Sequence, residues 1–148
     1  MTTKKQTILI TGCSTGIGLE SALYMQRNGF DVYATAREKK DIENLKELGL
    51  NCLLLDVTKP DTIKDCLDEV LKQTNGTLDI LFNNAGFGQP GAVEDLTTQT
   101  LKDQFETNVF GLHEVTIQVL SIMKAQGYGK IINHSSVLGL VSLKLRGA

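Results

Sequence analysis

The chain has 148 residues, 41% of them hydrophobic and 22% charged, as expected for a single globular domain with a core of its own. Its 15 basic and 17 acidic residues nearly cancel and form no basic block, which argues against nucleic acid as a partner. Residues 1–6 are too short for a signal peptide, and no apolar run reaches the roughly 20 residues of a membrane span, so a cytoplasmic protein without membrane contact is expected.

A glycine-rich turn follows the first predicted strand, at residues 7–10. Its glycines have the spacing G-x-x-x-G-x-G, in Gly12, Gly16 and Gly18. Such a turn lets the backbone approach the pyrophosphate of a dinucleotide, whose charge then meets the positive end of the following helix. Alternatively, these residues mark an ordinary strand-to-helix loop.

Strands and helices then alternate along the chain. Helices are predicted at 17–27, 41–47, 61–74 and 99–126, and further strands at 31–36, 51–56, 78–82 and 130–133. The third strand is apolar without alternation, which predicts that both of its faces are covered. This α/β alternation predicts a doubly wound parallel sheet.

Each strand ends in small or polar residues, where such sheets bind their ligands. These strand ends are the glycine turn, Ala36-Arg37, Asp56-Val57, residues 83–86 and residues 134–136. The alternative is that the strands simply reach the surface there. His134 is expected near the wall of the pocket.

The three cysteines, Cys13, Cys52 and Cys66, are odd in number and widely spaced. This pattern indicates reduced thiols and neither a disulfide framework nor a zinc site. Cys13 lies in the glycine turn, where it is either a small filler or, beside a helix N-terminus, a reactive thiol.

Together these motifs resemble the short-chain dehydrogenase/reductase family over essentially the whole chain. The resemblance is carried by the glycine turn, by Asp56, by Asn83-Asn84-Ala85-Gly86, by Asn108 and by Ser136. It implies a Rossmann-type sheet, here partial, with about five strands in the order 3-2-1-4-5. It also implies a nicotinamide cofactor bound by Gly12, Ser14, Thr15, Gly16, Ile17, Gly18, Arg37, Asp56, Val57, Asn83, Ala85 and Gly86.

The roles within that set also follow from the resemblance. Asp56 and Val57 would border the adenine, and Asn83 and Ala85 would line the adenosine ribose. Asn84 would instead tie strands together.

The end of the second strand indicates which cofactor is used. An NAD site places an acidic residue there, where this chain has Ala36, followed by Arg37. Because a guanidinium suits a 2′-phosphate, NADP is predicted ahead of NAD. Alternatively, Arg37 belongs to a solvated helix start and Glu38 takes the place of the NAD-binding acid.

The resemblance implies hydride transfer between the cofactor and an apolar alcohol or carbonyl substrate. In that chemistry Ser136 hydrogen-bonds the substrate oxygen, and Asn108 holds a water that leads to a catalytic lysine. The family's Tyr-x-x-x-Lys motif is absent from the chain and would begin directly after Ala148. We therefore expect a single domain, residues 1–148, that is C-terminally incomplete and inactive alone, taken from a larger homo-oligomeric enzyme. The rival hypothesis is a regulatory module that binds NADP without turnover.

Overall fold

Residues 5–147 are described by a computed structural model of the chain. Their strands form one parallel sheet in the order β3-β2-β1-β4-β5, as predicted. Element ends agree with the sequence prediction to within about two residues. The strands are β1 (Thr7–Ile10), β2 (Asp31–Ala36), β3 (Asn51–Leu54), β4 (Ile80–Asn83) and β5 (Lys130–Asn133).

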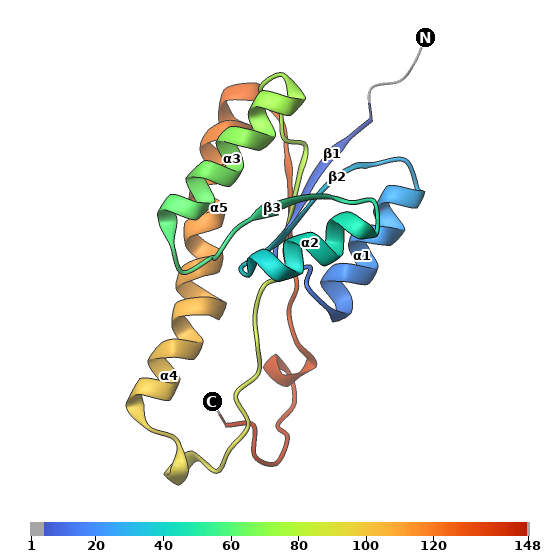
Figure 1. Ribbon diagram of the computed structural model, residues 1–148. Helices are drawn as coiled ribbons and strands as arrows, with labels where there is room; N and C mark the ends of the chain where they lie inside the picture. Colours follow the sequence, from blue (N-terminus) through green and yellow to red (C-terminus); the bar gives the residue numbers. More distant parts are fainter. Residues whose placement is uncertain (1–4, 148) are drawn as a thin grey trace.

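Helices cover both faces of the sheet (Figure 1). One face carries α1 (Gly16–Arg27) and α2 (Lys39–Glu47), and the other carries α3 (Pro60–Thr74) and α5 (Leu112–Gln126). This three-layer arrangement is the doubly wound α/β fold that the alternation predicted.

Alternation along β1 divides the core between the two faces. Leu9 packs in the cluster that α3 and α5 cover, whereas Ile8 and Ile10 pack in the cluster that α1 and α2 cover. All three side chains are fully buried. Burying a side chain of this size stabilises a fold by about 1.5–3 kcal/mol, so the central strand is firmly held and its end is a rigid support.

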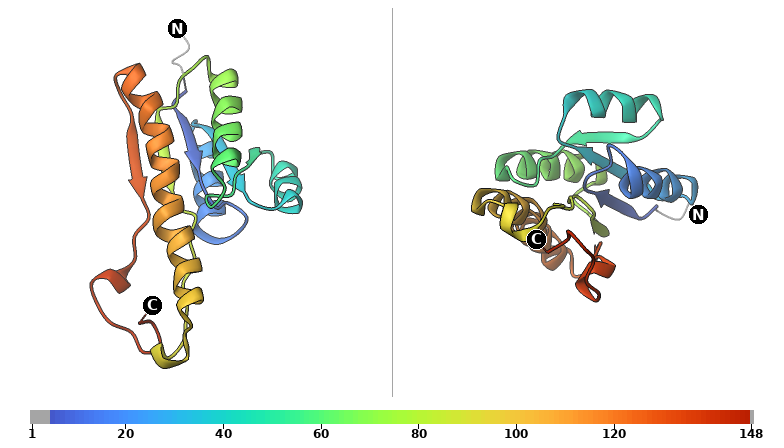
Figure 2. Two further views of the ribbon diagram at one scale, coloured as in Figure 1. Left: turned by 90° about the vertical axis from the view of Figure 1, so that its left-hand side faces the viewer. Right: turned by 90° about the horizontal axis from the view of Figure 1, so that it is seen from below.

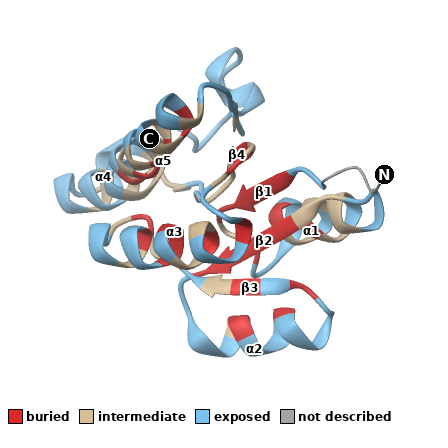
Figure 3. Cartoon of the chain, turned by 90° about the horizontal axis from the view of Figure 1, so that it is seen from above, coloured by how far each residue is buried: buried red, intermediate tan, exposed pale blue. Residues whose placement is uncertain are grey.

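The third strand differs from its prediction. It lies at one end of the sheet (Figure 3). Within residues 5–147 it pairs only with β2, and Asn51 is exposed while Leu54 retains 40% of its surface. Its apolar run continues into Leu55 and Val57, which are buried after the strand has ended. The missing alternation therefore reflects a buried strand exit and not coverage on both faces.

The helix predicted at 99–126 is interrupted by a π-helical turn. It begins as α4 (Thr98–Phe105), capped by Thr97, whose Oγ1 accepts a hydrogen bond from the Thr100 N–H at 3.1 Å. The π-helical turn η2 (Glu106–Gly111) follows, and α5 then continues along the sheet. Figure 2 shows α4 extending beyond the sheet as a continuation of α5.

The segment after β5 returns to the chain that follows β4. The Gly91 N–H donates to the Leu145 carbonyl at 3.0 Å, and Gly91 forms a parallel bridge with Arg146. This contact closes a loop beside the carboxyl ends of β4 and β5. Among residues 5–147, no helix combines the length and apolar character needed to cross a bilayer.

Candidate functional site

A groove of about 390 Å³ lies at the carboxyl ends of the central strands. The predicted cofactor residues line it, with two exceptions, Gly16 and Asn83. The residues that do so are Gly12, Ser14, Thr15, Ile17, Gly18, Arg37, Asp56, Val57, Ala85 and Gly86. The fold therefore brings four separate parts of the sequence to one concave surface.

Two glycines allow the floor of this groove to pack tightly. Gly12 has φ of 71°, and a Cβ there would lie 2.8 Å from the Ala85 Cα. A Cβ on Gly18 would collide with the Gly12 carbonyl oxygen and lie 2.5 Å from Asn84 Nδ2. Because neither position has room for a side chain, the backbone itself forms the surface that a ligand would contact.

Hydrogen bonds join the ends of β1 and β4 beneath the glycine turn. Thr11 Oγ1 accepts from the N–H groups of Asn84 at 3.0 Å and Ala85 at 2.9 Å. Asn84 Nδ2 donates to the carbonyls of Thr11 at 2.9 Å and Gly12 at 3.0 Å. Asn84 thus ties the two strand ends together, as the resemblance implied.

Asn83, which was predicted to line the ribose, is not among the residues that line this groove, and its contact with the ribose stays a prediction. Its side chain is buried and donates to Thr116 Oγ1 at 3.0 Å and to Asn133 Oδ1 at 2.9 Å. Successive residues of a strand point to opposite faces, so Asn83 is directed toward α5 and β5 while Asn84 lines the groove. The alternation rule, applied at the end of β4, would have indicated that the Asn83 and Asn84 side chains point in opposite directions.

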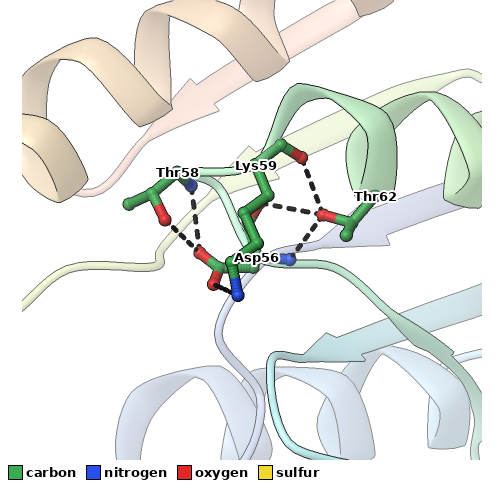
Figure 4. Close-up of polar contacts among 4 residues, drawn as sticks. All are labelled: Asp56, Thr58, Lys59 and Thr62. Atoms are coloured by element: carbon green, nitrogen blue, oxygen red, sulfur yellow. Dashed lines mark hydrogen bonds and ion pairs between the residues drawn. The ribbon is translucent and has the colours of Figure 1, made fainter.

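Asp56 organises the turn between β3 and α3 (Figure 4). Its Oδ1 accepts from the Thr58 N–H at 3.0 Å and from Thr58 Oγ1 at 2.7 Å, and its Oδ2 lies 3.3 Å from Lys59 Nζ. Partial burial raises the pKa of Asp56, but the hydrogen bonds from Thr58 and the Lys59 ammonium outweigh it, so this pKa lies below its usual value. The carboxylate stays ionised and holds the groove wall in place.

The opposite wall carries positive character. Arg37 follows β2, is exposed and lines the groove, and none of the ion pairs within residues 5–147 includes it. At the start of α1, the Thr15 side chain makes no capping hydrogen bond and the first turn has no acidic residue. The helix N–H groups and the guanidinium are therefore available to an anionic ligand.

A second cavity, of about 550 Å³, adjoins the groove. The two share residues 84–87 and His134, which stands on the pocket wall as predicted. His134 Nδ1 lies 3.0 Å from Asn84 Oδ1. An amide oxygen only accepts, so Nδ1 is the protonated nitrogen in this contact.

The two predicted catalytic residues, Ser136 and Asn108, both line the second cavity. Ser136 Oγ accepts from the Leu138 N–H at 3.1 Å, which leaves its own proton free to be donated. Asn108, within η2, accepts from the Phe87 N–H at 3.0 Å and donates to the Phe87 carbonyl at 2.7 Å. Asn108 therefore fixes the chain after β4, a contact that spacing alone did not indicate, and its role in holding a water stays a prediction.

Cys13 is a filler and not a reactive thiol. The side chain is fully buried, and burial raises the pKa of its thiol to about 12. Nucleophilic chemistry needs the thiolate, so the proximity of α1 does not activate this residue.

Comparison with known proteins gives consistent matches. The family model described as short chain dehydrogenase matches residues 6–148. The uncharacterized oxidoreductase YbbO of Escherichia coli is 42% identical over 144 residues, which cover 97% of this chain and 54% of that protein. The 3-ketodihydrosphingosine reductase of Bacteroides thetaiotaomicron is 36% identical over 142 residues, covering 96% and 51%. The chain spans about half the length of the curated relatives it matches.

Solved structures agree in fold. ElxO with NADP bound matches with a TM-score of 0.89 and 28% identity, covering 97% of this chain and 60% of that one. A variant of actinorhodin polyketide ketoreductase with NADPH matches with a TM-score of 0.86 and 31% identity, covering 96% and 57%.

Proposed function

Since the chain belongs to the short-chain dehydrogenase family, we propose that it forms part of an NADP-dependent oxidoreductase that acts on an apolar alcohol or carbonyl compound. The observation that carries the proposal is the groove between the glycine turn, Arg37 and Asp56-Val57, which opens into the cavity of Ser136. A homo-oligomeric, cytoplasmic enzyme remains the prediction from the sequence.

The groove fits a nicotinamide dinucleotide. Gly12 and Gly18 remove the side chains that would block the approach of a pyrophosphate, and the uncapped start of α1 faces the same surface. Arg37 supplies a cation at the end of β2, where Ala36 replaces the acidic side chain typical of NAD sites. The structures with NADP and NADPH bound among the matches support the same choice.

When bound, the nicotinamide supplies a hydride to, or accepts one from, the substrate carbon that is bonded to the reacting oxygen. The residues of this chain would position the partners in that exchange. Ser136 would donate its free proton in a hydrogen bond to the substrate oxygen, which stabilises negative charge developing there. Asn108 would keep the Phe87 backbone in place as a shared wall of both cavities.

Calorimetric titration of the chain with NADPH and with NADH tests the cofactor. We expect NADPH to bind more tightly, and Arg37→Ala to lose about tenfold or more of that affinity, the worth of a charge-assisted hydrogen bond. Lys40→Ala is the matched control, because Lys40 is an exposed cation of α2 that does not line the groove. Tighter binding of NADH, or equal losses in the two variants, would contradict the proposal.

A further inference from the structure

The second cavity has an unbalanced charge. Arg146 lines it, and no aspartate or glutamate is among its lining residues within the described part of the chain. The ion pairs found in residues 5–147 involve other cations, so no carboxylate of the described residues neutralises the Arg146 guanidinium. An uncompensated guanidinium beside a cavity is a binding group for an anion.

Backbone contacts fix the main chain of Arg146 beside the cavity. The Arg146 N–H donates to the Leu143 carbonyl at 3.1 Å, and the bridge to Gly91 fixes the residue from its other side. Leu145 has φ of 62°, a conformation that a branched residue rarely adopts. The guanidinium lies over Gly88, where a Cβ would be 2.9 Å from Nη1. The turn thus directs Arg146 toward the chain that follows β4.

The other walls suit the remainder of an amphipathic substrate. Phe87, Leu112 and Leu138 provide apolar surface, and Ser136 lies on the same cavity. Gln104 also lines this cavity and adds a polar amide to its wall.

We propose that Arg146 forms an anion subsite, so that the substrate carries a carboxylate or phosphate at a distance from its reacting carbonyl or alcohol. This inference rests on the proposed function, because it takes the Ser136 cavity as the substrate site. It narrows the substrate class from apolar carbonyl compounds to those with one anionic end.

Matched pairs of ketones test the subsite by binding alone. The probes are 4-oxopentanoate against its methyl ester, and dihydroxyacetone phosphate against dihydroxyacetone, titrated at low salt with NMR detection, with and without NADPH. We expect the anionic member of at least one pair to bind about tenfold more tightly than its neutral partner. The pair that shows the larger preference identifies carboxylate or phosphate as the group recognised.

Variants then assign the preference to one side chain. Arg146→Gln should abolish it, and Arg146→Lys should retain part of it because the charge remains. Lys144→Gln is the matched control, since Lys144 is an exposed cation two positions away that lines neither cavity. Absence of any preference in the wild type, or its loss in Lys144→Gln as well, would overturn the proposal.

Cofactor affinity separates this inference from the proposed function. Arg146→Gln should bind NADPH as tightly as the wild type does. If the variant instead loses NADPH affinity by as large a factor as it loses the preference for the anionic ketone, the guanidinium binds the cofactor and the anion subsite is overturned. If NADPH does not bind at all while the preference dependent on Arg146 persists, the subsite stands and the proposed function fails.

Discussion

A pair of glycine substitutions would measure how much the close contact between Gly12 and Ala85 beneath the groove limits the free energy of unfolding when a side chain is added. Gly12 and Gly16 both have positive φ, of 71° and 61°. A Cβ on Gly12 would lie 2.8 Å from the Ala85 Cα, whereas a Cβ on Gly16 would meet nothing within 4 Å. Alanine therefore introduces similar backbone strain at both positions, but only alanine at position 12 also collides with a neighbouring residue.

The expected magnitudes follow from that difference. An L-residue in the left-handed region costs roughly 1–2 kcal/mol, and both variants carry this cost. Overpacking against a backbone atom adds about 1–3 kcal/mol, which only Gly12→Ala carries. Because domains of this kind unfold with about 5–15 kcal/mol, Gly12→Ala would lose a large part of the total.

Urea unfolding followed by far-ultraviolet circular dichroism measures the comparison, with the free energy of unfolding extrapolated to water. We expect Gly12→Ala to be less stable than Gly16→Ala by about 1–3 kcal/mol. Equal losses, or a larger loss in Gly16→Ala, would refute the argument that contact with Ala85 requires glycine at position 12.

Three further predictions concern the catalytic and structural polar groups. In the larger enzyme that the sequence predicts, Ser136→Ala should lower kcat by about 10²–10³ without weakening NADPH binding, and Ser135→Ala should have a much smaller effect. Similar losses in the two variants would contradict the assignment of Ser136. Because the folded pKa of Asp56 lies below its usual value, its carboxylate stabilises the fold above the unfolded pKa of about 3.9, and this is lost as pH falls through the folded pKa. Asp56→Asn should therefore cost about 1 kcal/mol of unfolding free energy at pH 7 and progressively less as pH falls through the folded pKa, and equal stability of the variant and the wild type at pH 7 would count against this role. Because the 148 residues contain no tyrosine with a lysine four positions later, this chain alone should bind NADPH without oxidising it when ketones are present, and steady NADPH loss in a spectrophotometric assay would disprove this.

Local pattern was sufficient to predict the elements because their periodicity is strong. The apolar run at 7–10 and the helical stripe from Ile63 to Val70 correspond to buried faces of β1 and α3. The position of a strand within the sheet depends instead on long-range pairing, so the exposed side of β3 was not evident from its own residues. An edge strand that is followed by buried residues has the same apolar run in its sequence as a central strand, so the run alone does not separate the two.

The site was predicted to the level of segments but not always of side chains. Adjacent asparagines at the end of β4 have the same chemistry, and only the alternation of the strand separates Asn83, bonded to Thr116, from Asn84 on the groove. Asn108 was selected through the family motif, but its bonds to Phe87 span 21 residues of sequence. Contacts of this kind depend on where the helix lies in the fold, which no local pattern encodes.

The π-helical turn η2 also sets the angular phase between two parts of one long helix. A π turn places an extra residue in the helix, and each residue of an α-helix corresponds to about 100° of rotation. Deleting one residue from η2 would therefore rotate α4 by about 100° relative to Val115 and Val119, which are buried against the sheet. Gln104 would then turn away from the second cavity while the packed part of the helix stayed in place. Which side chain α4 presents to the second cavity is thus selected by the length of this turn as well as by the residues of α4.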